Sequence, residues 1–116
     1  MKPLALVITG LPALAFAAVS PFGPFRLDVP ARGFEEHCVK LDSGDAVRYR
    51  FRASGEVDFN VHYHRGSEVF YPVRTPDTLA AEGDFKAPLA DTYCLMWERK
   101  REGAVRIDGA VERLRR

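Results

Sequence analysis

The sequence has little of what catalysis and nucleic-acid binding require. Its formal net charge is only +1 at pH 7 over 116 residues, so it lacks the overall positive charge that draws a protein to nucleic acid. There is no G-x-S-x-G nucleophile motif and no glycine-rich phosphate loop. The carboxylates are scattered, and no pair of them can be assigned acid and base roles. These absences predict a protein that is not an enzyme and has no nucleic-acid partner.

Long hydrophobic runs are also missing. Residues 4–19 carry no charge, but they are interrupted by Gly10 and Pro12 and fall short of the roughly 20 apolar residues of a membrane-spanning helix. With Lys2 before them and Ala15-Phe16-Ala17 near their end, they are typical of a cleaved secretory signal peptide, and an uncleaved anchor is the alternative. We therefore predict a periplasmic or secreted protein without a stable membrane span, divided into a signal peptide (1–17), a linker (18–24) and one domain (25–116).

Only two cysteines, Cys38 and Cys94, are present. In an exported protein, an even number of cysteines indicates a disulfide. Closing a loop of about 55 residues would stabilise the fold by about 4 kcal/mol in the chain-entropy model. The bridge would either join neighbouring strands or cross between sheets. The alternative is two free thiols or thiolate metal ligands.

Helical periodicity does not persist for three turns anywhere, whereas an alternation of period two is frequent. Val47, Tyr49 and Phe51 alternate with three arginines, as in a strand with one dry and one wet face. Ser54-Gly55-Glu56 predicts a turn, and 74–82 is polar, weakly patterned and compatible with a single helical turn. Turn signals recur about every 8–12 residues, so we predict an all-β, two-sheet antiparallel β-sandwich of about seven or eight strands. The expected strands are 25–29, 34–41, 47–52, 57–64, 68–73, 83–87, 91–98 and 105–111.

A series of short motifs runs through these strands. In order, they are Phe34-Glu35-Glu36-His37-Cys38, Gly44-Asp45, Ser54-Gly55 before Val57-Asp58-Phe59, Glu68 to Tyr71, Gly83 to Ala87, and Tyr93-Cys94 before Leu95-Met96-Trp97. Together they resemble the GOLD (Golgi dynamics) β-sandwich family, found in emp24-type cargo receptors. The resemblance implies a GOLD-like fold, a disulfide between the two cysteines and a disposition toward protein binding. The receptors' coiled coil and transmembrane helix have no counterpart here, so cargo selection is not implied.

The sharpest candidate for chemistry is His62-Tyr63-His64. Residues two apart in a strand project from the same face, with Cα atoms about 6–7 Å apart, so the two imidazoles would suit copper or zinc. The alternative is a polar pair that only hydrogen-bonds its neighbours. Further ligands would come from His37, Met96, Asp58, Asn60 or Glu68.

A second candidate is a recognition surface. Phe70 and Trp97 stand out of phase with their neighbours and, if exposed, would form a binding surface together with Asp58 and Asn60, because aromatic side chains dominate binding energy. The alternative for the aromatics is core packing.

We predict an exported, non-enzymatic protein-interaction or envelope-associated module whose partner is another envelope or secreted protein. A periplasmic copper- or zinc-binding protein is the main alternative, and a structural subunit that pairs through its edge strands is a third.

Overall fold

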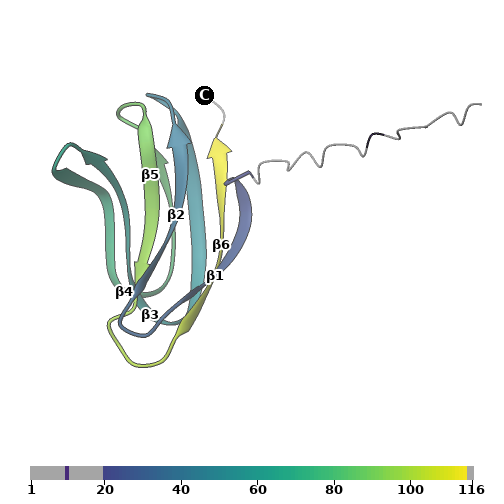
Figure 1. The fold of residues 1–116 in the computed structure, drawn as a ribbon, viewed down its shortest axis with the longest axis vertical. Helices are drawn as coiled ribbons and strands as arrows, with labels where there is room; N and C mark the ends of the chain where they lie inside the picture. Colours follow the sequence, from purple (N-terminus) through teal and green to yellow (C-terminus); the bar gives the residue numbers. More distant parts are fainter. Residues whose placement is uncertain (1–9, 11–19, 115–116) are drawn as a thin grey trace, which may run out of the picture.

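The computed structural model describes Gly10 and residues 20–114 (Figure 1). Apart from Gly10, the predicted signal peptide lies outside the described residues. Within them the protein is all-β, and no helix is long or apolar enough to cross a membrane. There are six strands: β1 (Gly23–Val29), β2 (Phe34–Leu41), β3 (Ala46–Arg65), β4 (Glu68–Lys86), β5 (Asp91–Glu98) and β6 (Val105–Leu114).

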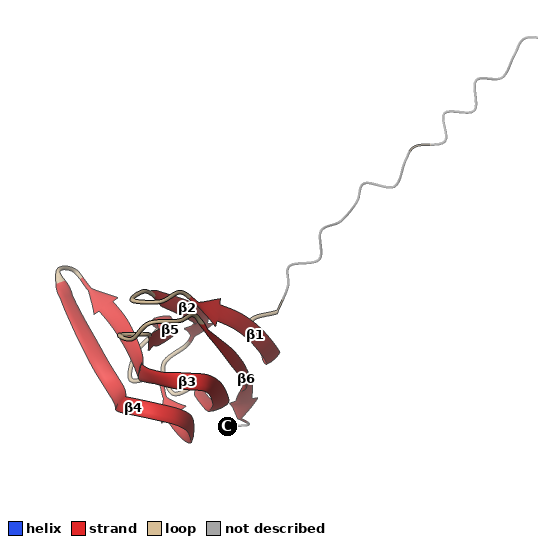
Figure 2. Cartoon of the chain, turned by 90° about the horizontal axis from the view of Figure 1, so that it is seen from below, coloured by secondary structure: helices blue, strands red, loops and turns tan. Residues whose placement is uncertain are grey.

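The strands form two antiparallel layers that share β3 and β4. Residues 46–53 of β3 pair with β6 on one side and with the last part of β4 on the other, and β1 continues this layer beyond β6. Residues 58–62 of β3 pair with β5 and with the first part of β4, and β2 continues this second layer beyond β5. Figure 2 shows the strands from below, arranged around the core. The predicted all-β, two-layered sandwich is confirmed.

The expected strand count was too high because two predicted breaks do not interrupt the chain. The segment Ser54-Gly55-Glu56 bends β3 and shifts its register instead of reversing it. Ser54 Oγ accepts a hydrogen bond from Arg106 N at 2.8 Å, and the Arg99 guanidinium donates to the Glu56 carbonyl at 2.8 Å. A Cβ atom on Gly55 would lie 2.7 Å from Val105 Cγ1, so glycine is needed for this close approach. The bend carries β3 from one layer into the other.

The polar segment 74–82 is part of β4 and contains no helical turn. It pairs only with β3, at the edge of both layers. Nearly all side chains of β4 are exposed or half-buried, so this strand lacks the apolar alternation that reveals a strand in a sequence. The predicted strands 47–52 and 57–64 are thus both part of β3, and the predicted strands 68–73 and 83–87 are both part of β4.

Trp97 lies at the centre of the core. Its side chain is fully buried and packs against the rings of Phe25, Phe51 and Phe59 at centroid distances of 5.4–5.6 Å. Core packing is therefore confirmed for Trp97, and the alternative prediction that it forms part of a surface is wrong. Gly109 lies within β6, where an added Cβ would meet the Phe25 ring at 2.7 Å.

The predicted Cys38–Cys94 disulfide is present. The two cysteines are directly opposite each other in the β2–β5 ladder. The bridge therefore joins neighbouring strands of one layer and does not cross between the layers.

Candidate functional site

The candidate site lies on the outer face of the second layer, where the register aligns side chains from several strands. Cys38 of β2 lies opposite Cys94 of β5, which lies opposite His62 of β3. The adjacent row contains Glu36, Met96, Asn60 and Arg74 in the same strand order, ending on β4. We call this surface the histidine face. It comprises Glu36, Cys38, Asn60, His62, His64, Tyr71, Arg74, Cys94 and Met96.

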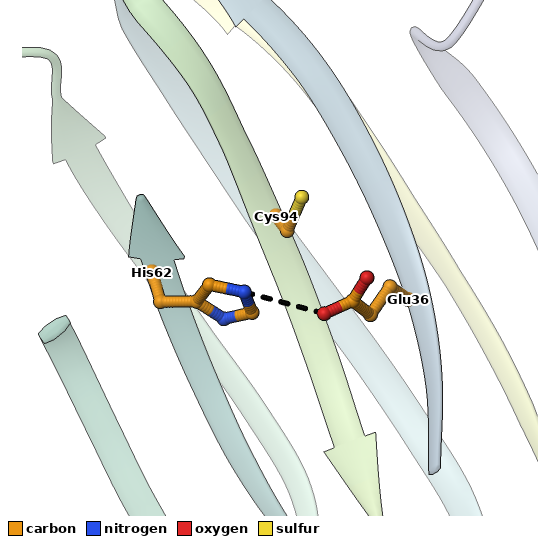
Figure 3. Close-up of side chains that lie close together, drawn as sticks. All are labelled: Glu36, His62 and Cys94. Atoms are coloured by element: carbon orange, nitrogen blue, oxygen red, sulfur yellow. Dashed lines mark ion pairs between the residues drawn. The ribbon is translucent and has the colours of Figure 1, made fainter. Parts of the chain in front are cut away.

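His62 is the most unusual residue of this face. It is only 4% exposed, and among the described residues Asp45 is the only other buried polar or charged side chain. Its Nε2 atom lies 3.2 Å from Glu36 Oε1, and its Nδ1 atom lies 2.7 Å from Asn60 Oδ1 (Figure 3). Burial lowers the pKa of His62 below its ordinary value of 6.5, Glu36 opposes that shift and His64 adds to it. The imidazole is thus held in its neutral form near pH 7.

The predicted pairing of His62 with His64 on one face is observed. Their ring centroids are 5.3 Å apart in an edge-to-face arrangement, and the Tyr71 ring lies 5.8 Å from His62. The Arg74 guanidinium lies over the Tyr71 ring, 3.9 Å from its centroid. His64 is exposed, whereas its neighbour is enclosed.

The structure places His37 away from this pair. Its ring stacks on Phe25 at 4.5 Å, and its Nε2 atom lies 2.7 Å from the Pro21 carbonyl oxygen. Successive residues of a strand point to opposite faces, so His37 points inward and Glu36 points outward. Sequence reasoning therefore selected the wrong residue of β2. The signal that could have found Glu36 is its position two residues before Cys38, on the same side of the strand.

Only one group of three His, Cys, Asp or Glu donors could hold a metal within the part of the chain that the structure describes. It contains Glu36, His62 and Cys94, whose donor atoms all lie within 4.8 Å of one another. The Cys94 sulfur is already bonded to Cys38. The oxidised protein therefore offers two free donors there, and copper or zinc binding by that form stays a prediction.

A second feature is the tip of the β3–β4 hairpin, which Figure 1 shows standing apart from the other strands. Three consecutive large side chains, Val69, Phe70 and Tyr71, are 38–40% exposed. The Phe70 ring stacks on Tyr63 at 5.2 Å, and Tyr63 packs on Tyr93 at 5.1 Å. The tip therefore exposes apolar side chains on both faces of the hairpin: Phe70 lies on the side that leads into the core, and Tyr71 lies on the histidine face.

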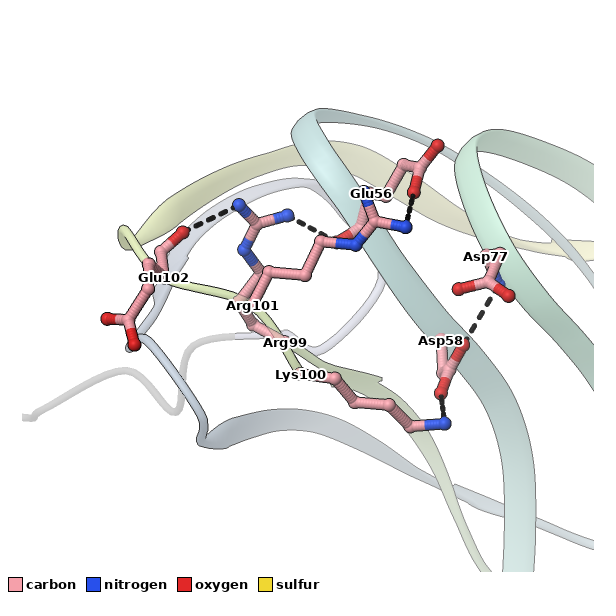
Figure 4. Close-up of polar contacts among 7 residues, drawn as sticks. All are labelled: Glu56, Asp58, Asp77, Arg99, Lys100, Arg101 and Glu102. Atoms are coloured by element: carbon pink, nitrogen blue, oxygen red, sulfur yellow. Dashed lines mark hydrogen bonds and ion pairs between the residues drawn. The ribbon is translucent and has the colours of Figure 1, made fainter.

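The remaining predicted surface residues have structural partners. Asp58 forms an ion pair with Lys100 at 2.5 Å and accepts a hydrogen bond from Asp77 N at 2.9 Å (Figure 4). Asn60 faces the His62 ring. Phe70 is thus the only one of the four predicted surface residues that is exposed without a polar partner.

The edge of β4 near the tip is poorly suited to pairing with another strand. Pro72 and Pro76 lie in the first part of this edge strand. Proline has no N–H group and is tolerated at a sheet edge where that group would face solvent. Two backbone donors are therefore missing from the free edge, and recognition here would depend on side chains.

No known protein family matches the chain by sequence, and no curated protein does so either. Among the solved structures that share its fold are the following two. One is Aeromonas hydrophila PliG, a periplasmic lysozyme inhibitor of g-type lysozyme, with a TM-score of 0.64 and 15% identity over 85% of this chain and 91% of that chain. The other is the pre-peptidase C-terminal domain of a Bacillus anthracis collagenase, with a TM-score of 0.62 and 10% identity over 78% of this chain and 89% of that chain. At these identities the likeness concerns the fold alone, and the GOLD resemblance stays a prediction.

Proposed function

We propose that this protein is an exported, non-enzymatic protein-binding module whose partner docks on the tip of the β3–β4 hairpin. The observation that supports it is the run of exposed Val69, Phe70 and Tyr71 at the end of the longest pair of strands. Exposed aromatic side chains are typical anchors of protein interfaces.

The tip is also rigidly held, which favours binding. Phe70 rests on Tyr63, and Tyr71 is covered by the Arg74 guanidinium. Side chains that are already ordered lose less conformational entropy when a partner binds. A partner would therefore meet preformed apolar and cationic contacts.

The class of partner follows from the compartment. A disulfide persists in oxidising compartments, and the structurally similar A. hydrophila PliG is periplasmic and inhibits g-type lysozyme. We propose an envelope or secreted protein as partner, and a g-type lysozyme is the first probe to test.

The test places a photo-crosslinking residue at position 71 and, as a matched control, at position 79. Leu79 lies on the same strand and is 54% exposed, but it is outside the tip. Position 71 should crosslink to one envelope protein or to the purified lysozyme, and position 79 should not. Unlabelled wild-type protein should compete with this product, whereas the Phe70→Ser/Tyr71→Ser double variant should not. Equal crosslinking from both positions would refute docking at the tip.

A further inference from the structure

We propose that reduction of the Cys38–Cys94 disulfide turns part of the histidine face into a site for Zn²⁺ or a similar thiophilic ion, with Cys38, Cys94, His62 and Glu36 as its four ligands. This inference is independent of the proposed docking at the hairpin tip. It uses a cluster of donor atoms that three strands bring together.

Three of the four donor atoms are already close to one another, and the fourth is bonded to one of them. Those of Glu36, His62 and Cys94 lie within 4.8 Å of one another, and Cys38 Sγ is 2.06 Å from Cys94 Sγ. Figure 3 shows Glu36 from β2 and His62 from β3 approaching each other over β5, which carries Cys94. In a tetrahedral zinc site with bonds of about 2.0–2.3 Å, neighbouring ligand atoms are about 3.3–3.8 Å apart. The 3.2 Å between His62 Nε2 and Glu36 Oε1 is close to that spacing.

The environment of His62 is that of a metal ligand. A neutral imidazole carries one N–H. In the tautomer that carries this proton on Nδ1, the ring donates it to Asn60 Oδ1, which lies 2.7 Å away. The Nε2 atom then presents its lone pair toward the Glu36 carboxylate, and a cation between them would bond to both. Histidines that bind metals usually donate the other ring N–H to an oxygen in this way.

The disulfide is what withholds the remaining ligands. Two thiols of a reductant, or one dithiol, supply two electrons, so the S–S bond breaks, two cysteine thiols form and the reductant becomes a disulfide. Metal binding then releases one proton from each thiol, giving two thiolate ligands. Cys38 is exposed and β2 is the end strand of its layer, so a reductant can reach the bridge. The backbone pairing of β2 with β5 does not depend on the bridge, so the strands that carry Glu36, Cys38 and Cys94 stay in register.

The experiment titrates the purified protein with Co²⁺, a spectroscopic substitute for zinc, before and after reduction with a phosphine. The reduced protein should bind one equivalent and show thiolate-to-cobalt charge-transfer absorption that Zn²⁺ abolishes, whereas the oxidised protein should show none. His62→Ala and Glu36→Gln should each weaken binding, the former by about tenfold or more. The controls His37→Ala and His64→Ala should leave the affinity of the reduced protein within about twofold.

Folding of the reduced protein is followed in parallel by circular dichroism. Zn²⁺ should raise the melting temperature of the reduced protein and not that of the oxidised protein, because the ion binds the folded dithiol form. Cobalt binding that is no tighter after reduction would overturn the proposal. So would a loss of affinity in His37→Ala as large as that in His62→Ala, because an unfolded chain would bind metal without regard to the folded arrangement. Unfolding on reduction that Zn²⁺ does not reverse would overturn it as well.

Discussion

Both outer faces of the sandwich are formed by every second residue of their strands, but the side chains on the two faces differ in chemistry and in exposure. On the first layer, which we call the arginine face, the exposed side chains meet partners of opposite charge. These pairs are Arg26–Asp108 at 2.5 Å, Arg48–Asp84 at 2.8 Å, Arg106–Asp28 at 3.8 Å and Arg50–Glu112 at 3.9 Å. The histidine face instead encloses a neutral imidazole beside a disulfide and ends in an exposed apolar tip.

The difference shows that register, more than composition, decides what a face can do. Arg48 lies between Asp84 and Glu112 in neighbouring strands, and opposite charges in such positions stabilise a sheet modestly while they remain hydrated. His62 has Cys94 opposite it on β5 and Glu36 within reach on β2. One face is a solvated surface, as the alternating arginines predicted, and the other brings together groups that can bind a ligand.

The largest expected effect comes from removing the bridge of the histidine face. The Cys38→Ser/Cys94→Ser variant should lose about 4 kcal/mol of unfolding free energy, because the unfolded chain regains the entropy of its open loop. The 56-residue separation of the cysteines sets this magnitude. Urea unfolding of the oxidised wild type and the variant measures it, with the reduced wild type in metal-free buffer as the control. A loss below about 1 kcal/mol would mean that the unfolded state is already compact.

A smaller effect is expected at the bend between the two faces. Burial would raise the pKa of Asp58, but the Lys100 ammonium and the Asp77 N–H outweigh it, so its pKa lies below the ordinary 3.8. Asp58→Asn should cost about 1–2 kcal/mol at pH 7. Because the folded-state pKa is the lower one, this contribution is full above pH 3.8 and is lost as the pH falls through the folded value.

Urea titrations of wild type and Asp58→Asn at pH 7 and pH 3 test this dependence. The difference between the two proteins should shrink at the lower pH. Asp28→Asn, which removes an exposed carboxylate 3.8 Å from Arg106, serves as the control and should change little. A difference for Asp58→Asn that is as large at pH 3 as at pH 7 would contradict the ion-pair explanation.

The smallest effect is expected on the arginine face. Arg48→Met keeps the apolar stem and removes the pair with Asp84, and both partners are exposed. Exposed ion pairs contribute little and are screened by salt. The urea midpoint should move only slightly in dilute buffer and coincide with that of the wild type at about 1 M salt. Crosslinking from position 71 should be unchanged, and its loss would mean that the partner also contacts this face.

Much of the architecture was predictable because it depends on local patterns. The positions of β1, β2, β5 and β6 follow from alternation and turn residues, and the even cysteine count indicated the bridge. The bend at residues 54–56 was not predictable, since Ser-Gly-Glu is an equally good turn. What prevents reversal there is the contact with Arg99, Val105 and Arg106, which are about 50 residues distant in sequence.

The candidate site was predictable only in its β3 half. His62 and His64 share a face because side chains in any strand repeat with period two, and no other strand is needed for that inference. Which residue of β2 faces them depends on the β2–β5–β3 register, and that register selects Glu36 instead of His37. In the same way, the apolar character of Trp97 was evident, but only the packing of two layers placed it inside.

The sequence by itself determined the all-β class, the cysteine pair and the alternation within each strand, because these depend on residue type and on neighbours along the chain. The tertiary structure decided which side chains share a row and which of them are buried. That decision depends on pairing between distant strands, where a shift of one residue exchanges the two faces. The meeting of Glu36, His62 and the disulfide is a product of that pairing.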